Sequence, residues 1–212
     1  MVTLNSRTEL IKSAKKLFFS NGYEDTTTRM IANDCDINSG LISYYFKNKK
    51  NLAKLVLIDH FEEIVSQIIS LCGNLDSLVI FLLFQRLNQF YFERDKIFND
   101  FILETMNLNI MEEACLECSY FELVMNIVKD YHYQRAFDLQ TASILFLCYT
   151  QDAHSRIFFH IKKKTLRLTY KQYYELFTER IFELLAIPQN EQITLLDTIE
   201  VNMTNLIEKY YS

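Results

Sequence analysis

Glycine and proline are scarce in this sequence, which contains three glycines and one proline in 212 residues. Both residues commonly form the turns between strands, so their scarcity leaves few positions at which a sheet could reverse direction. Apolar residues instead recur with the 3.6-residue period of a helix from residue 49 onward. The sequence therefore predicts an all-α fold, with later helices at about 48–71, 75–93, 96–108, 111–132, 138–163, 168–187 and 191–210.

The first 47 residues contain signals for three short helices. An S-x-x-E capping box begins at Ser6, and Gly22 marks the end of the helix that follows it. Thr26 and Asn38 can each cap a further helix, and only a short turn at 35–37 separates these two. Two short helices joined by a tight turn are typical of a helix-turn-helix that reads DNA.

The third of these helices has two different faces. Ile42 and Phe46 are four residues apart and are expected to anchor the helix in the small domain, whereas Leu41 and Tyr44 point outward. Gly40 has no side chain, so the backbone can approach the bases closely there. Such a face suits the major groove, where outward side chains meet base edges.

These residues resemble the N-terminal signature of the TetR family of bacterial transcriptional regulators, over about residues 6–60. The matching positions are Phe18, Phe19, Gly22, Tyr23, Thr26, Thr27, Thr28, Arg29, Ile31, Ala32, Gly40, Tyr44, Tyr45, Phe46, Lys49, Lys50, Asn51 and Leu52. The resemblance implies a DNA-binding regulator, most often a repressor. It also implies a helix-turn-helix DNA-binding domain at 1–47 and a larger helical effector-binding and dimerisation domain at 48–212.

The resemblance further implies which residues contact DNA. The residues expected at or near the bases are Arg29, Ser39, Gly40, Leu41, Ser43 and Tyr44, and those expected to hold phosphates are Thr28, Tyr45 and Lys49. Arg29 can donate two hydrogen bonds to one guanine. Because one short helix contacts few bases, we expect a homodimer on a palindromic double-stranded operator.

Charge is divided unevenly along the chain. Residues 1–54 carry nine Lys and Arg against five Asp and Glu, whereas residues 55–212 carry 13 against 22, for a total of −5. The basic part coincides with the predicted helix-turn-helix. The net negative charge of residues 55–212 would disfavour indiscriminate binding of this part of the chain to DNA.

The larger domain is expected to bind a small hydrophobic or aromatic effector and to form the dimer. The candidate effector contacts are Phe81, Gln85, Asn88, Phe101 and Glu104, and the candidate dimer contacts are Ala142, Ala153, Tyr173, Phe177, Ile181 and Leu184. Either set could equally belong to the core of the protein itself. A protein partner could also replace the effector, which would make the chain a DNA-positioned interaction module.

Some cysteine and histidine residues are candidates for metal or redox sites. Cys115 and Cys118 form a C-x-x-C that could sense metal or redox state, but on one continuous helix the same spacing also describes a buried stripe. The solvent exposure of the two cysteines distinguishes a metal or redox sensor from a buried stripe. His132, His154 and His160 lack the i, i+4 spacing of paired ligands on one helix face, so we expect no metal site.

Several classes of function have no motif in this sequence. It contains no Gly-rich phosphate loop, nucleophile elbow or H-E-x-x-H, so we expect neither an enzyme nor a bound cofactor. The longest apolar runs, such as 78–84 and 143–149, are much shorter than the roughly 20 residues of a membrane span. With no signal peptide and an odd number of cysteines, five, we expect a cytoplasmic protein with no membrane partner.

Overall fold

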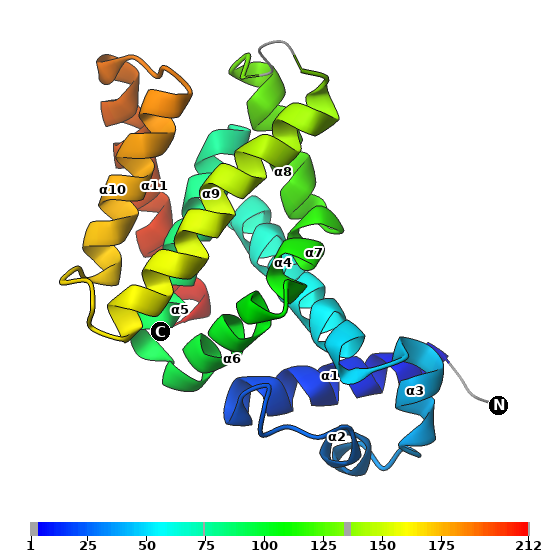
Figure 1. Ribbon diagram of the computed structural model, residues 1–212. Coiled ribbons are helices and arrows are strands. Elements are labelled where there is room, and N and C mark those ends of the chain that lie inside the picture. Colours follow the sequence, from blue (N-terminus) through cyan, green and yellow to red (C-terminus); the bar gives the residue numbers. More distant parts are fainter. Residues whose placement is uncertain (1–3, 74, 134–136, 212) are drawn as a thin grey trace. The chain divides into compact units, whose positions relative to one another are not determined.

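The computed structural model describes residues 4–73, 75–133 and 137–211, although the side chains of residues 4, 5, 151–153 and 155 are outside this description. Every regular element in these ranges is a helix, which confirms the predicted all-α class (Figure 1). The helices are α1 (Leu4–Asn21), α2 (Thr28–Asp34), α3 (Gly40–Phe46), α4 (Lys49–Cys72), α5 (Ser77–Arg94), α6 (Lys96–Asn107), α7 (Ile110–Leu116), α8 (Ser119–Asp130), α9 (Leu139–Lys162), α10 (Tyr170–Leu184) and α11 (Gln189–Tyr210). None of these helices combines the length and apolar character needed to cross a membrane.

Residue contacts divide the chain into two compact units. The first unit combines Met1–Phe61 with Arg94–Glu117, so it contains α1–α3, the first half of α4, α6 and α7. The second unit combines Glu62–Glu93 with Cys118–Ser212, so it contains the rest of α4, α5 and α8–α11. The predicted domain at 1–47 is therefore only part of the first unit, because α6 and α7 pack with it.

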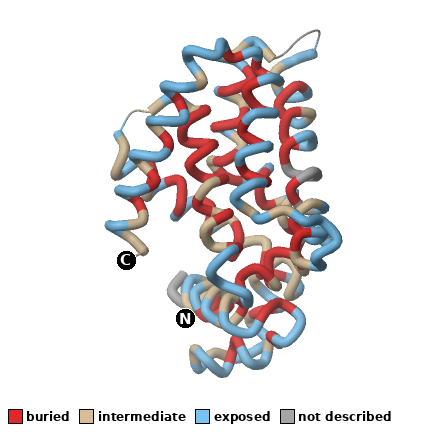
Figure 2. The backbone as a smooth tube through the Cα atoms, turned by 90° about the vertical axis from the view of Figure 1, so that its left-hand side faces the viewer, coloured by how far each residue is buried: buried red, intermediate tan, exposed pale blue. Residues whose placement is uncertain are grey.

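Apolar residues of α1, α3 and α6 fill the core of the first unit. Phe18 of α1 is fully buried and stacks on Phe101 of α6, with ring centroids 5.3 Å apart. Ile42 and Phe46 of α3 are buried as well, as their spacing predicts. Figure 2 colours the backbone by burial and shows buried segments in each part of the chain. The packing makes α6 a structural support of the helix-turn-helix.

The end of α1 follows local chemistry as predicted, whereas the starts of α1 and α2 differ from the prediction. Helix α1 begins at Leu4, two residues before the predicted capping box at Ser6. Gly22 has a φ of +86°, and its amide donates to the carbonyl of Phe18 at 3.0 Å, which ends α1 where expected. The cap of α2 is Thr27, whose hydroxyl accepts from the amide of Met30 at 3.2 Å. The prediction of Thr26 as the cap is wrong, because its buried hydroxyl donates to the carbonyl of Gly22 at 2.7 Å.

The segment predicted as one helix over 111–132 forms two helices, α7 and α8, so that prediction is wrong. The carboxylate of Glu62 accepts hydrogen bonds from both the amide and the hydroxyl of Ser119, each at 2.7 Å. Glu62 thereby supplies a partner for the first amide of α8, which has no partner within its own helix. The break also means that Cys115 and Cys118 do not share a continuous helix.

In the second unit, α5 lies inside the helical packing. All residues from Leu78 to Gln85 are buried, and α8 packs against α9. The hydroxyl of Tyr174 in α10 donates to the carbonyl of Leu82 at 3.2 Å, and the guanidinium of Arg86 lies 5.1 Å from the centre of the Tyr174 ring. These two contacts link α5 to α10 in the interior of the second unit.

Candidate DNA-binding surface and ligand cavity

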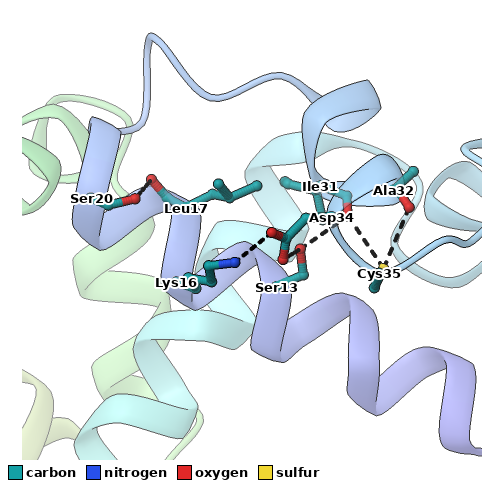
Figure 3. A network of polar contacts seen from close by, with 8 residues as sticks. All are labelled: Ser13, Lys16, Leu17, Ser20, Ile31, Ala32, Asp34 and Cys35. Atoms are coloured by element: carbon teal, nitrogen blue, oxygen red, sulfur yellow. Dashed lines mark hydrogen bonds and ion pairs between the residues drawn. The ribbon is translucent and has the colours of Figure 1, made fainter.

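A polar network holds α2 against α1 (Figure 3). The hydroxyl of Ser13 in α1 lies 3.0 Å from the carbonyl oxygen of Ile31 and 2.9 Å from the carboxylate of Asp34. Lys16 forms an ion pair with the same carboxylate. The hydrogen bonds from Lys16 and Ser13 hold the pKa of Asp34 below its usual value. The end of α2, and with it the entry to the turn, is therefore fixed by α1.

The turn between α2 and α3 depends on short polar residues. Asp36 has a φ of 52°, a left-handed conformation that Asp tolerates better than most residues. The side-chain oxygen of Asn38 accepts from the amide of Gly40 at 2.8 Å, so Asn38 caps the start of α3, as predicted, although Ser39 occupies the cap position itself. These contacts set the direction in which α3 leaves the turn.

The residues predicted to meet the bases are mostly exposed on α2, on α3 and in the turn. The exposed members are Arg29, Ser39, Gly40, Ser43 and Tyr44, whereas Leu41 is half-buried, as are the predicted phosphate contacts Thr28, Tyr45 and Lys49. Tyr44 is 76% exposed, while Ile42 and Phe46 on the opposite face are at most 2% exposed. The third helix thus has the anchored and outward faces that its sequence predicts.

Lys49 has two partners within the protein. Its ammonium donates to the carbonyls of Tyr23 and Thr26, at 2.9 and 3.1 Å, and lies 4.1 Å from the centre of the Tyr23 ring. These contacts join the start of α4 to the loop between α1 and α2. A phosphate contact by Lys49 stays a prediction, and the structure adds an internal role that the sequence did not suggest.

Acidic residues in α7 and directly after it neutralise part of the basic segment at the start of α4. Lys50 pairs with Glu113 at 2.8 Å, and Lys54 pairs with Glu117 at 2.8 Å. Because both lysines already have carboxylate partners, the excess positive charge of the helix-turn-helix lies mainly with other residues. Among these, Arg29 and Lys47 are exposed.

The five candidate effector contacts do not come together in one site. Phe101 and Glu104 belong to the first unit, where the carboxylate of Glu104 accepts from the amides of Tyr23 and Glu24 at 2.8 and 3.2 Å. Phe101 is fully buried against α1. Both residues therefore support the helix-turn-helix. Because they belong to the first unit, the structure does not support them as contacts of a ligand bound in the second unit.

The other three candidates, Phe81, Gln85 and Asn88, lie on α5 in the second unit. Phe81 is fully buried against Tyr120, and the side-chain amide of Asn88 donates to the carbonyl of Phe84 in its own helix at 3.0 Å. Gln85 belongs to a buried polar chain. Its amide nitrogen donates to the hydroxyl of Tyr120 at 2.7 Å, and its oxygen lies 3.0 Å from Nε2 of His154.

The polar chain continues from His154 to Tyr173 of α10. Nδ1 of His154 is hydrogen-bonded to the Tyr173 hydroxyl, and the ring stacks on Phe158 with centroids 5.3 Å apart. Burial lowers the pKa of His154 to about 3, so its ring is neutral near pH 7. The sequence indicates His154 only as a possible metal ligand, because its hydrogen-bond partners lie 19 and 69 residues away.

A cavity of about 630 Å³ opens between α9 and α10 in the second unit. Its lining residues are Tyr133, Tyr149, Thr150, Ile157, Leu166, Leu168, Tyr173, Leu176, Phe177, Arg180, Ile181 and Leu184. This volume is within the roughly 300–1,000 Å³ of small-molecule sites, which are usually concave and mainly apolar. The cavity is therefore the candidate ligand site of the second unit.

The predicted dimer stripe contributes to this cavity and to the protomer's own core. Tyr173, Phe177 and Ile181 are at most 7% exposed, and these three and Leu184 line the cavity. Ala142 is buried, and the side chain of Ala153 lies outside the described residues. The stripe as a whole does not form an open surface. Its regular spacing on α10 was the sequence signal that could have indicated a cavity wall.

The cysteines of the C-x-x-C are core residues. Cys115 is 1% exposed and Cys118 is 8% exposed. Among the residues that the structure describes, no three His, Cys, Asp or Glu side chains are grouped so that they could hold a metal ion. Burial of both thiols favours core packing over a metal or redox sensor. The two residues lie on either side of the break between α7 and α8, so they do not form the stripe of one continuous helix.

Comparison with known proteins agrees with the geometry of the first unit. Residues 10–56 match the family model described as bacterial regulatory proteins, tetR family. The probable HTH-type transcriptional regulator YttP of Bacillus subtilis (strain 168) is 26% identical over 170 residues, which are 70% of this chain and 79% of that protein.

Solved structures share the fold at low sequence identity. RolR in complex with resorcinol has a TM-score of 0.53 at 17% identity and covers 87% of this chain and 94% of its own. The fatty acid degradation regulator FadR from Bacillus halodurans has a TM-score of 0.51 at 15% identity and covers 86% of this chain and 99% of its own. The likeness confirms an N-terminal helix-turn-helix followed by a larger helical part.

Proposed function

We propose that the chain is a repressor, and its match to the tetR family of bacterial regulatory proteins supports its role as a transcriptional regulator. In this proposal a small hydrophobic or aromatic effector binds in the second unit and lowers the affinity of the protein for its operator. The DNA-binding half and the effector half depend on different observations, so each is argued separately.

The exposed face of α3 is the observation that carries the DNA-binding half. Tyr44 is 76% exposed beside the exposed Ser43, whereas Ile42 and Phe46 hold the helix from behind. A helix anchored on one side and open on the other can enter the major groove. Arg29 on α2 is also exposed and can donate two hydrogen bonds to a guanine.

A homodimer on a palindromic operator follows from the size of this surface. One helix of seven residues contacts few base pairs, so two copies are needed for a site that is rare in a genome. We propose that Ser39, Leu41 and Tyr44 of each copy contact one half-site. Because Ser39 and Ser43 are small, part of the specificity is expected to come from DNA shape.

The cavity between α9 and α10 supports the effector half. Its mainly apolar lining fits a hydrophobic molecule, and a fully packed second unit would have favoured a protein partner instead. RolR, which shares the fold, was solved with resorcinol, so a protein of this fold can hold a small aromatic molecule. Sensing through Cys115 and Cys118 has less support, because both thiols are buried.

Selection of DNA duplexes from a random pool by the full-length protein tests this function. We expect a palindromic consensus whose half-site centres are about one helical turn, or a multiple of it, apart. Arg29→Ala and Tyr44→Ala should each reduce the preference for that sequence over random DNA by roughly tenfold or more, measured by fluorescence anisotropy. Arg167→Ala, which removes an exposed arginine of the second unit, is the control and should bind like wild type. If Arg29→Ala and Tyr44→Ala both keep the wild-type preference for the selected sequence, the DNA-binding surface is assigned incorrectly.

A further inference from the structure

We propose that the cavity between α9 and α10 binds an uncharged, mainly apolar molecule with a hydroxyl group, such as an alkylphenol, and that Tyr173 accepts the hydrogen bond of this hydroxyl. This inference rests on the proposed function, because it names the chemical class of the effector. It follows from the charges of the lining and from the direction of the hydrogen bonds behind it.

Among the lining residues whose side chains are described, none offers a charge to a buried group of a ligand. Arg180 is the one charged side chain of this described set, and it is exposed, with its guanidinium donating to Glu183 at 2.9 Å. The buried wall consists of Thr150, Tyr173, Phe177 and Ile181. A charged group placed against this wall would lose its water without gaining a counter-charge, so an uncharged ligand is favoured.

The buried polar chain fixes the direction of the Tyr173 hydrogen bond. The amide nitrogen of Gln85 donates to Tyr120, so the amide oxygen faces Nε2 of His154, and this nitrogen must carry the proton. Because burial keeps the ring neutral, Nδ1 has no proton and accepts from the Tyr173 hydroxyl. The hydrogen of Tyr173 is thus committed to His154, and its oxygen can only accept.

The buried wall contains one other described hydroxyl, that of Thr150, and its hydrogen is also committed to partners within the protein. It donates to carbonyls of its own helix, with Phe146 at 3.0 Å and Leu147 at 3.1 Å. Both hydroxyls on this wall therefore offer only acceptor capacity to a ligand. A carboxylate or an ether, which can only accept, finds no donor among the described residues of this buried wall, whereas a hydroxyl group does find an acceptor.

Calorimetric titration of the full-length protein with three matched probes tests the inference. The probes are 4-hexylphenol, its methyl ether and 4-hexylbenzoate, which share the alkyl chain and the ring. We expect the phenol to bind roughly tenfold more tightly than the ether, the difference that one net hydrogen bond makes, and the benzoate to bind most weakly. Tyr173→Phe should bring the affinity for the phenol down to that for the ether and leave the ether unchanged.

Tyr149→Phe is the matched control, because it also removes a tyrosine hydroxyl from the lining, but at a position that is 67% exposed. It should change neither affinity. Equal binding of phenol and ether, tightest binding of the benzoate, loss of discrimination in Tyr149→Phe, or no binding of any probe would each overturn the inference.

Operator binding by the same preparations separates this inference from the proposed function. If the protein binds its selected operator but none of the probes, the inference fails and the DNA-binding function stands. If the phenol binds through Tyr173 without changing operator affinity, the inference stands and the effector half of the proposed function fails.

Discussion

Lys49 carries two kinds of contact that can be separated by experiment. Its ammonium is bonded to the carbonyls of Tyr23 and Thr26. We expect Lys49→Met to lower the free energy of unfolding by about 1–2 kcal/mol, because two partly buried carbonyls lose their donor. Urea denaturation measures this change. Lys47→Met, which alters an exposed lysine nearby, should leave stability unchanged.

The salt dependence of operator affinity tests whether Lys49 also holds a phosphate. Removing one phosphate contact should reduce the slope of log affinity against log salt concentration by about one. A variant that loses stability and keeps the wild-type slope would leave Lys49 with its internal role alone. Unchanged stability would show instead that the two hydrogen bonds contribute little.

The buried His154 and His60 make stability depend on pH. Burial lowers the pKa of each to about 3, whereas the unfolded chain titrates near 6.5. Below about pH 6.5 the unfolded chain therefore binds protons that the native state excludes. Stability is full above this pH and falls as the pH decreases toward 3, by up to about 1.4 kcal/mol per pH unit for each histidine.

His154→Gln should remove its share of this dependence. Urea denaturation between pH 6 and pH 5 is expected to show a slope about half that of wild type, because only His60 then contributes. A variant that is merely less stable would keep the slope. His132→Asn, at an exposed position, is the control and should keep it as well. A wild-type slope in His154→Gln would mean that this ring is protonated in the native state.

At the scale of elements, α6 supports the helix-turn-helix through the carboxylate of Glu104 in addition to its apolar core residues. Glu104 accepts from the amides of Tyr23 and Glu24, which follow α1. We expect Glu104→Ala to lower the free energy of unfolding by about 1.5–3 kcal/mol, the usual contribution of hydrogen bonds to a charged group. Glu104→Gln should recover part of the loss, since the amide oxygen can still accept.

Hydrogen exchange of the two loop amides measures the same support locally. The amides of Tyr23 and Glu24 should exchange faster in Glu104→Ala. Glu112→Gln, which changes an exposed glutamate of α7, should leave both the exchange rates and the stability unchanged. Wild-type protection of both amides in Glu104→Ala would contradict the assigned role.

The helices that the sequence predicts well are those whose ends depend on local chemistry. The predicted range 138–163 agrees with α9 because Asp138 accepts from the amide of Thr141 at 3.0 Å, three residues away. The break between α7 and α8 was not predictable in this way, since Glu62 lies 57 residues from Ser119. Helix periodicity carries no information about such a distant partner.

The same distinction applies to the candidate sites. The outward face of α3 could be predicted, because Ile42 and Phe46 mark the buried side within one helix. The partners of Lys49 lie up to 26 residues away, and those of Glu104 lie up to 81 residues away. The internal roles of these two residues could therefore not be predicted from the sequence. The cavity was also missed, because a gap between α9 and α10 depends on how side chains of both helices fit together.

For the whole molecule, the surface of the proposed homodimer stays a prediction, and the predicted stripe on α10 is largely buried within the protomer. Tyr173, Phe177 and Ile181 are buried in the single protomer, so they are not available to a second copy as it stands. Other apolar side chains of the late helices are exposed, among them Ile144 and Phe159 of α9. Exposed apolar residues of α9 are therefore further candidates for the surface of the proposed homodimer.

Ile144→Glu tests whether this face of α9 forms the dimer. A carboxylate placed in an apolar interface loses its hydration without gaining a partner, so we expect the dimer to dissociate at least tenfold more readily in sedimentation equilibrium. Ile193→Glu changes an isoleucine of α11 that is 59% exposed and should leave the association constant unchanged. A palindromic operator needs the helix-turn-helix domains of two copies of the chain. Ile144→Glu should therefore also weaken operator binding at low protein concentration. Dissociation by Ile193→Glu alone would place the interface on α11 instead, and an unaffected dimer in both variants would exclude both faces.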